Sequence, residues 1–453
     1  MIDPSDPGSV FRQTSTASRS SGIGLAEYVA LHRVPWTLAY IGFMIYFTII
    51  TTYIANLGTV AMAVAIVALF LGDGRIRWPL PTRIFVMFWM WASLSTVLSE
   101  YPGDFEELLT FGRVLLVFLV SVNVLRHPRR LRFFLLFYVA CFALYPARGT
   151  LFNYFIYSNA AFGRAAWRDS FGNPNDMAAL TLLALALAAS FLHKQVPSIV
   201  RFGALLASCL VFPVVILMTQ SRAAFIGLSV FVLLVVLSAR QKRMRAIVAV
   251  AVVAAIVITV APADVWQRIA GLQYATSTET IGMIDPEGSA EQRWEIWQTG
   301  FNVIADHPVL GVGLGRYEQA NSVYNPSLGR RDIHDTYLEV LAETGVPGLV
   351  LFLWLLAASI LRARRARRNA QALRGSEDWQ RLVLLELGLY GYLVAGVWGT
   401  FGYLSLLYIY LAIVYAQAEV LDAQAAEASG NPDSSIPVGP RTRHGTQSAA
   451  NPT

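Results

Sequence analysis

Cysteine is nearly absent from this sequence: two residues, Cys141 and Cys209, occur in a chain of 453. Both lie inside long apolar runs, and they suit neither a disulfide framework nor a thiolate zinc site. We expect both side chains to pack as small hydrophobes. The scarcity of cysteine therefore excludes a disulfide-stapled domain and a cysteine-based metal centre.

Charge is scarce as well. Charged residues make up 14% of the chain and hydrophobic residues 55%, a balance that is atypical of a soluble globular domain. The net charge of +6 would suit nucleic-acid binding if the basic residues shared one soluble face, but they lie in breaks between apolar runs. The composition predicts a membrane protein and no nucleic-acid partner.

Apolar runs long enough to cross a bilayer recur along most of the chain. They are too long and too continuously apolar for barrel strands, so the predicted fold is an all-α, polytopic membrane bundle. We expect about twelve transmembrane helices, at residues 36–55, 57–72, 84–98, 108–125, 131–149, 176–192, 202–219, 223–239, 246–262, 346–361, 381–398 and 401–418.

Lysine and arginine are concentrated in alternate breaks between these runs. The positive-inside rule places such loops in the cytoplasm. With twelve spans, all of the basic breaks fall on one side of the membrane together with both termini, so the topology is self-consistent. The basic breaks are residues 75–83, 126–132, 194–201, 240–245 and 362–374.

One long polar segment, 263–345, falls on the opposite side in this topology. It holds five arginines and twelve acidic residues, which suits an extracytoplasmic loop. No cleavable signal peptide is expected, because the first 21 residues are polar. We expect a largely disordered cytoplasmic N-terminal segment (1–35), transmembrane helices one to nine (36–262), this outer loop (263–345), transmembrane helices ten to twelve (346–418) and a disordered cytoplasmic tail (419–453).

Topology leaves two of the six histidines on the outer side, His307 and His334. His307 precedes a proline, where a turn or cap role is favoured. His334 begins the stretch HDTYLEVLAETG, which we expect to form a short amphipathic helix at the membrane surface, with Gly345 as its C-cap and Pro347 in the first turn of the next span. His334 is then either a functional base or an ordinary helix-terminus histidine beside capping acids.

Three arginines lie at or near outer span ends, where the positive-inside rule disfavours them: Arg113, Arg148 and Arg222. Each needs an anionic partner. Arg222 starts a span, where the helix dipole also favours an anion, and phosphate oxygens suit a guanidinium. The alternative is contact with lipid headgroups or pairing with Glu106 or Glu107.

The outer loop contains two further patterns. The stretch Ala290–Asp306 has the periodicity of an amphipathic helix, with Arg293 beside an aromatic face. The glycines of GVGLG, 311–315, predict a tight turn, and they do not form a dinucleotide site because no βαβ unit surrounds them.

The segment FGNPNDMA, 171–178, precedes the sixth span. It is expected to cap that span through Asn175 or Asp176, or alternatively to place Asn173 on a ligand. A divalent cation site is another alternative, because Asp332, Asp335 and Glu339 could bind such an ion through oxygen ligands. Three acids within eight residues are a weak metal signal, so no metal ion is expected.

Taken together, these stretches resemble the bacterial O-antigen ligase and O-antigen or exopolysaccharide polymerase superfamily. The resemblance is carried by SRAAFIGL at 221–228, the helix around Arg293, DHPVLGVGLGRY at 306–317 and HDTYLEVLAETGVPGL at 334–349. Their order and spacing agree over most of residues 36–418. One departure is Asp335, where Asn or Ser is usual.

The resemblance implies a GT-C-like integral membrane glycosyltransferase of the bacterial inner membrane, with its active site on the periplasmic side. The donor would be a glycan on undecaprenyl pyrophosphate, and the acceptor either lipid A core, for a ligase, or another carrier-linked glycan, for a polymerase. By the family's pattern His334 is the base, and Arg222 and Arg293 bind the pyrophosphate. No cofactor is expected.

Further candidates for the site are Arg148, Arg113, Asp335 and Asn173. A neutral histidine that accepts the proton of an attacking hydroxyl predicts inversion at the anomeric carbon without a metal ion. Short outer loops apart from 263–345 favour the ligase, because they leave room for a bulky lipid-borne acceptor. The rivals are a flippase for lipid-linked sugar and a metal-dependent glycosyltransferase using Asp104, Glu106 and Glu107.

Overall fold

A computed structural model describes residues 24–29, 33–55, 57–72, 76–158, 163–239 and 289–429, with scattered positions between 243 and 266. Every regular element in these ranges is a helix, which confirms the predicted all-α class for this part of the chain. The helices are α2 (Leu25–Val29), α3 (Leu38–Thr52), α4 (Gly58–Leu71), α5 (Leu80–Val97), α6 (Glu106–Val124), α7 (Pro128–Phe142), α8 (Arg148–Phe155), α9 (Pro174–Ala189), α10 (Ser198–Leu206), α11 (Phe212–Met218), α12 (Arg222–Ser238), α15 (Ser289–Asp306), α16 (Tyr317–Tyr324), α17 (Thr336–Asn369), α18 (Glu377–Ala395) and α19 (Ser405–Ala428).

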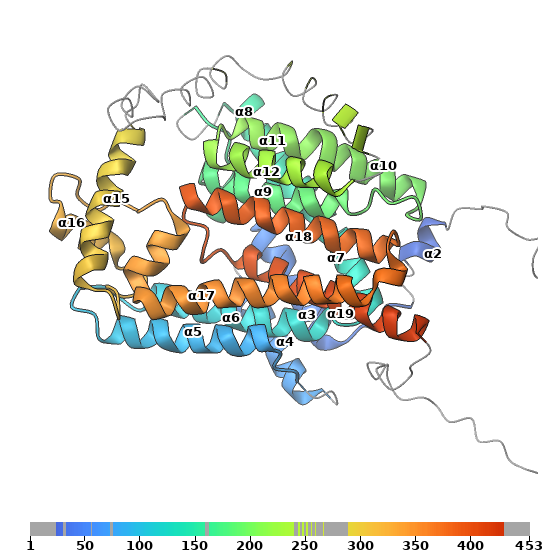
Figure 1. Ribbon diagram of the computed structural model, residues 1–453, viewed down its shortest axis with the longest axis horizontal. Helices are drawn as coiled ribbons and strands as arrows, with labels where there is room; N and C mark the ends of the chain where they lie inside the picture. Colours follow the sequence, from blue (N-terminus) through green and yellow to red (C-terminus); the bar gives the residue numbers. More distant parts are fainter. Residues whose placement is uncertain are drawn as a thin grey trace, which may run out of the picture.

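Short helical segments complete the bundle. The π-helical segments η2 (Ala143–Ala147) and η4 (Ala207–Val211) join α7 to α8 and α10 to α11, and the 3-10 turns are η3 (Asp169–Phe171), η8 (Gln371–Leu373) and η9 (Gly396–Trp398). The long helices run roughly side by side, with α15 and α16 beyond one end of the bundle and α2 at the other (Figure 1). We refer to these as the α15 end and the α2 end.

Helices overlap eleven of the expected spans, and most of the remaining one, 246–262, lies outside the described residues, although its few described positions are helical. Six of the helical stretches described are long and apolar enough to cross a membrane, and four more are shorter apolar helices. The chain is therefore a multi-pass membrane protein by the length and composition of its helices. The count of twelve and the cytoplasmic position of the termini stay predictions.

The helix starts follow from local sequence. A polar side chain at the residue before the helix accepts a hydrogen bond from a backbone N–H of the first turn, which satisfies a donor that the helix itself leaves open. Residues with this role are Thr37, His127, Asn173, Ser221, Asp335 and Ser376, before α3, α7, α9, α12, α17 and α18.

The core is centred on α9, whose residues from Met177 to Ala188 are all buried, and on its packing against α18. Small residues allow α12 to approach α18 closely. A Cβ at Gly227 would lie 2.5 Å from the carbonyl oxygen of Gly391, so both helices need glycine here. This close contact fixes the start of α12 near the end of α18.

The helix α17 bends at Gly345, whose backbone adopts φ 66° and ψ −175°. A Cβ at this position would lie 2.0 Å from the carbonyl oxygen of Val309, so the turn requires glycine. The prediction that Gly345 ends one helix before the next begins is confirmed. The first segment, however, is buried rather than lying on a surface: Val340 and Thr344 are fully buried and Glu343 is 4% exposed.

Two other sequence predictions about elements have clear outcomes. The helix α19 continues through Ala428, so residues 419–428, expected in a disordered tail, are helical, and Leu421 is fully buried. The remainder of that tail lies outside the described residues. Cys141 is buried and Cys209 half-buried, both as free thiols, which agrees with a packing role.

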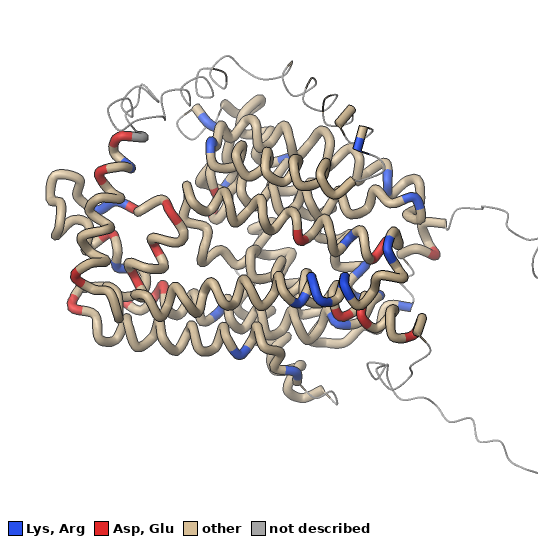
Figure 2. Tube along the Cα trace, in the orientation of Figure 1, with Lys and Arg blue, Asp and Glu red and all other residues tan. Residues whose placement is uncertain are grey.

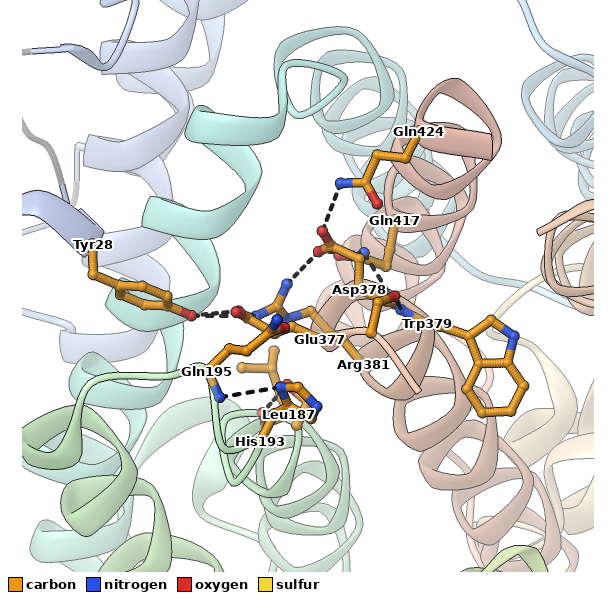
Figure 3. Close-up of polar contacts among 12 residues, drawn as sticks. Tyr28, Leu187, His193, Gln195, Glu377, Asp378, Trp379, Arg381, Gln417 and Gln424 are labelled. Atoms are coloured by element: carbon orange, nitrogen blue, oxygen red, sulfur yellow. Dashed lines mark hydrogen bonds and ion pairs between the residues drawn. The ribbon is translucent and has the colours of Figure 1, made fainter. Parts of the chain in front are cut away.

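Charged residues gather at the two ends of the bundle (Figure 2). The basic stretch at the end of α17 lies toward the α2 end, whereas acidic residues are frequent around α15 and α16. At the α2 end the fully buried guanidinium of Arg381 pairs with Glu377 and Asp378 of its own helix. Tyr28 of α2 donates a hydrogen bond to Glu377, so this polar cluster ties α2 to α18 (Figure 3).

Candidate functional site

The turn between α18 and α19, residues 396–401, is the meeting point of the segments that carry the predicted site residues. Helix α12, which begins at Arg222, packs against η9 in this turn. Arg293 of α15 donates a hydrogen bond from Nη1 to the carbonyl oxygen of Trp398, at 3.5 Å. Thr400 donates from its hydroxyl to Oδ2 of Asp332, at 2.7 Å.

His334 lies immediately before α17 and is held from both sides. Thr336 donates its hydroxyl to the carbonyl oxygen of Gly399 (2.6 Å) and accepts the backbone N–H of Phe401 (2.8 Å). The backbone of His334 has φ 53°, the left-handed region that residues with a side chain rarely adopt. A strained residue that persists next to several anchors is typical of functional sites.

The imidazole of His334 faces Asp332. Its Nδ1 lies 3.4 Å from Oδ2 of Asp332, and both side chains are 33% exposed. Burial is the main influence on the pKa of His334 and lowers it below its usual value, Asp332 opposes this shift, and the cations Arg293 and Arg331 add to it. The lowered pKa favours the neutral ring, which is the state a general base requires.

Arg293 is close to His334 because α15 is fixed against the segment before α17. Trp297, one turn after Arg293, donates its ring N–H to the carbonyl oxygen of Ile333 at 2.9 Å. Ile333 is fully buried and packs with Ile296 of the same helix. The predicted helix from about Ala290 to Asp306 is thus present as α15, and it brings Arg293 to the His334 side of the structure.

Arg222 is the first residue of α12, after the N-cap Ser221. It is half-buried, at the positive end of the helix dipole, as the sequence predicts for an anion ligand. The preceding residue Gln220 has φ 53°, so the chain turns sharply into this helix. Because α12 contacts η9, the turn that also accepts Arg293, both predicted phosphate ligands approach the same part of the bundle.

A second arginine lies beside the start of α12 and was not identified from the sequence. Arg164 donates to the carbonyl oxygen of Thr219 at 2.8 Å and to Oδ1 of Asn175 at 2.7 Å. Its neighbour Ala165 donates its backbone N–H to the carbonyl oxygen of Met218, which fixes the loop to the end of α11. Only the fold could reveal this, since no local pattern links residue 164 to residue 219.

The start of α9 connects the Arg222 region to His334. Asp176, in the first turn of α9, is close enough to Asp332 for their carboxylates to repel each other. Its neighbour Asn175 accepts the hydrogen bond from Arg164. The start of α9 therefore lies near both Arg164 and Asp332.

The cap of α9 differs from the prediction. Asn173 is the N-cap, and its side chain accepts the backbone N–H of Asn175 at 2.8 Å. Asn175 and Asp176 were the predicted caps, and that prediction is wrong. Because Pro174 occupies the first helical position, the cap is the residue that precedes it. Asn173 is thus engaged with its own helix.

Arg148 and Arg113 are not joined to this site by the contacts of the described residues. Arg148 is exposed and lies over the ring of Phe152, 4.4 Å from its centroid. Arg113 is exposed on α6, with its guanidinium close enough to Tyr46 of α3 to act on that hydroxyl electrostatically. Their proposed role in the site stays a prediction.

Asp335 has a structural use. Its Oδ1 accepts the backbone N–H groups of Tyr337 and Leu338, at 2.8 and 2.9 Å, and so caps α17. Burial raises the pKa of Asp335, and these two hydrogen bonds oppose the rise. Asn and Ser, the usual residues here in the superfamily, are also good N-caps, so the departure at this position preserves the same contact.

The carboxylates of this region do not form the cation site that the sequence left as an alternative. Among the described residues, no three His, Cys, Asp or Glu side chains converge in an arrangement that could hold a metal ion. One oxygen of Asp335 is used by the helix cap, and Asp332 faces Thr400 and His334.

His307, the other histidine predicted to lie on the outer side, lies in a separate arrangement. Its Nε2 is 3.2 Å from the hydroxyl of Tyr101, and its backbone N–H extends the hydrogen bonding of α15 to Val303. With Tyr101 and Asp306 it lines a cleft of about 230 Å³. The expected role at a helix end is confirmed for the backbone.

Comparison with known proteins supports the resemblance. Residues 204–353 match the sequence model of a family described as O-antigen ligase. The matched region is about one third of the chain and contains Arg222, Arg293 and His334. It confirms the predicted resemblance to the O-antigen ligase and polymerase superfamily and supports an enzymatic activity of that type. No match to a curated protein was found.

Proposed function

We propose that this protein transfers a glycan from undecaprenyl pyrophosphate to a sugar hydroxyl, on the periplasmic face of the inner membrane. The observation that carries the proposal is the arrangement around η9. A neutral, half-exposed histidine lies beside one arginine, while the helix that begins with a second arginine packs against the same turn. These are the groups that a base-assisted displacement of a diphosphate requires.

In the proposed reaction, the oxygen of the acceptor hydroxyl attacks the anomeric carbon of the donor while His334 accepts the proton of that hydroxyl. The bond between that carbon and the diphosphate oxygen breaks, and the diphosphate leaves with the electron pair. A positioned base of this kind contributes about 10² to 10⁴ in rate. Attack opposite the leaving group inverts the configuration at the anomeric carbon.

The arginines act on the leaving group. Negative charge on the diphosphate grows as the bond breaks, and preorganised guanidinium groups stabilise it more strongly than they stabilise the ground state. Arg222 and Arg293 are held by different helices, α12 and α15, so they can approach a diphosphate from two sides. A site between helices also lets the polyprenyl chain remain in the bilayer.

The family match is compatible with a ligase and with a polymerase, which share the donor and differ in the acceptor. We favour the ligase, with lipid A core as acceptor, because the outer loops other than 263–345 are short. The phenotype of a deletion strain distinguishes the two. Loss of long chains from lipopolysaccharide with carrier-linked polymer retained indicates a ligase, whereas single capped repeat units indicate a polymerase.

The direct test is transfer by the purified protein in lipid nanodiscs, with a labelled undecaprenyl-pyrophosphate-linked glycan and a lipid A core acceptor. We expect His334→Ala to reduce the transfer rate by about 10² to 10⁴ and to retain donor binding, because the base acts only as bonds change. His307→Ala is the matched control and should retain transfer. Wild-type rates in His334→Ala would overturn the mechanism.

The same preparation separates the rival functions. Movement of labelled donor across a vesicle without a new glycosidic bond would indicate a flippase. Loss of transfer in chelator, restored by a divalent cation, would indicate the metal-dependent rival. Under the proposed mechanism transfer continues in chelator.

A further inference from the structure

We propose that Asp332, held in place by Thr400, is the positioning residue that orients His334 for its role as base. The inference rests on the proposed function for its effect on turnover, but the structural relationship can be tested without any activity. In this arrangement the carboxylate faces Nδ1 of His334, which leaves Nε2 as the nitrogen that accepts a proton from the acceptor hydroxyl.

The two oxygens of Asp332 have different contacts. Oδ1 accepts the backbone N–H of His334 at 3.3 Å, and Oδ2 lies 3.4 Å from Nδ1 of the same residue. One carboxylate therefore contacts both the backbone and the ring of His334. The ring contact is long for a hydrogen bond, as catalytic contacts often are before a substrate is bound.

Thr400 fixes the carboxylate from the opposite side. Its hydroxyl donates to Oδ2, the oxygen that faces the imidazole, at 2.7 Å. Thr400 belongs to the turn whose neighbouring residues Gly399 and Phe401 both bond to the hydroxyl of Thr336. The turn thus holds the residues on both sides of His334, Asp332 through one contact and Thr336 through two.

The contact between Asp332 and the backbone of His334 stabilises an unusual backbone conformation. A residue with a side chain is strained in the left-handed region, so the φ of 53° at His334 needs stabilisation from neighbouring groups. The hydrogen bond from the backbone N–H of His334 to Asp332 provides it within the same loop. Strain and orientation are therefore controlled by one side chain.

The chemical consequence concerns the imidazolium that forms in the reaction. A carboxylate at Nδ1 fixes the tautomer, with the proton on Nδ1, and stabilises the positive charge once Nε2 has accepted the second proton. Asp332 does not itself take up a proton. The charged groups that act on the ring from neighbouring elements are Asp332, Arg293 of α15 and Arg331. Asp332 is the one that favours the charged ring.

The first test measures His334 directly, by NMR titration of the full-length protein labelled with ¹⁵N-histidine in nanodiscs, without substrate. The signal of His334 is assigned by its loss in His334→Gln. In Asp332→Asn we expect the pKa of His334 to fall, because the carboxylate that favours the imidazolium is gone, and the Nδ1-protonated tautomer to lose population. Asp306→Asn, an acid at the end of α15 bonded to Tyr324, is the matched control and should change neither.

The second test measures turnover against pH. We expect Asp332→Asn to lower the maximal rate by about 10-fold to 100-fold, the range seen when the partner that orients a functional histidine is removed. The acid limb of the profile should move to lower pH, since the base must be neutral and its pKa has fallen. Thr400→Val should lower turnover less, and Thr400→Ser, which keeps the hydroxyl, should restore it.

The outcomes separate the two proposals. An unchanged pKa and tautomer of His334 in Asp332→Asn would overturn the positioning role, even if His334 proves essential. Reduced turnover with an unmoved acid limb would also overturn it, because a merely structural change has that result. Changed titration of His334 in a protein whose His334→Ala variant transfers normally would support the contact and refute the proposed function instead.

Discussion

The polar clusters at the two ends of α18 differ in how exposed their side chains are. At the α2 end, the guanidinium of Arg381 is 1% exposed and bonds to Glu377 and Asp378, as Figure 3 shows. Beyond the other end, His334 and Asp332 face each other at 3.4 Å, each 33% exposed. About 30 Å of helix separates these ends, given the rise of an α-helix over 19 residues.

The Arg381 cluster is closed to ligands by its own hydrogen bonds. Asp378 also accepts from Gln417 and Gln424 of α19, at 3.1 and 2.7 Å, and Tyr28 bonds to Glu377. Nearby, His193, which is labelled in Figure 3, lies with Nε2 3.1 Å from the carbonyl oxygen of Gly375. A buried charge surrounded in this way holds helices together, and breaking it is costly.

The His334 region is built differently. Its polar groups come from four segments, α12, α15, the loop before α17 and the turn after α18, and the ring and its carboxylate remain accessible. The comparison teaches that charge inside a membrane protein has two uses. Where the protein supplies every partner, charge stabilises the fold, and where groups stay accessible, they are available to a substrate.

The largest expected effect tests the closed cluster. Arg381→Met leaves the carboxylates of Glu377 and Asp378 buried without their cation, so we expect the free energy of unfolding in mixed micelles to fall by about 3–5 kcal/mol. Donor affinity of the folded protein should stay unchanged. Arg365→Met, an exposed arginine of α17, is the control and should change stability by less than about 0.5 kcal/mol. Equal stability of both variants would remove the contrast between the clusters.

The next largest effect concerns the arginines of the His334 region. Arg222→Ala and Arg293→Ala should each weaken binding of the undecaprenyl-pyrophosphate-linked donor by about 10-fold to 100-fold, because each removes charge-assisted hydrogen bonds to phosphate. Arg148→Ala should change affinity by less than about twofold, since this side chain lies over Phe152. Microscale thermophoresis in nanodiscs measures all three. A larger loss in Arg148→Ala than in the other two would relocate the anion site.

A smaller effect concerns the helix that follows His334. Asp335→Ala removes the N-cap of α17, and we expect the free energy of unfolding to fall by about 0.5–2 kcal/mol. Asp335→Asn keeps an oxygen acceptor and should preserve both stability and transfer. If the asparagine variant loses transfer while remaining stable, Asp335 has a role in the site beyond capping.

The smallest effect sharpens the electrostatics of His334. Arg331 is exposed, and its positive charge disfavours the imidazolium, so Arg331→Gln should raise the pKa of His334. The base is then neutral over a narrower range, and the acid limb of the pH profile of transfer should move slightly to higher pH. A move to lower pH would contradict this electrostatic description.

Several elements could be predicted because their signals are local. The apolar runs predicted the helices, the glycine at 345 predicted the break in α17, and the stretch 290–306 predicted α15. The cap of α9 was misplaced by two residues because Asn173, Asn175 and Asp176 are all plausible caps in isolation. The position of Pro174 decided which one acts.

The helix after His334 shows why a surface cannot be predicted from such a signal. Leucines and acids at helical spacing predicted an interfacial helix, but Val340 and Thr344 are fully buried, and the glycine turn at 311–315 covers the helix end. Val312 and Gly313 donate their backbone N–H groups to the last carbonyl oxygens of this helix. The covering segment is separated by about thirty residues, so the local pattern carries no information about it.

The sequence alone determined that this protein is a helical membrane protein, that His334, Arg222 and Arg293 are its best candidates for chemistry, and that they fall in one family motif region. It did so because hydrophobic length, charge and short motifs are properties of neighbouring residues. The tertiary structure decided that Asp332 and Thr400 lie beside His334, and that Arg164 lies beside the start of α12. Contacts such as Thr400 to Asp332 span 68 residues, and only the packing of α12, α15 and α18 around one turn brings such groups together.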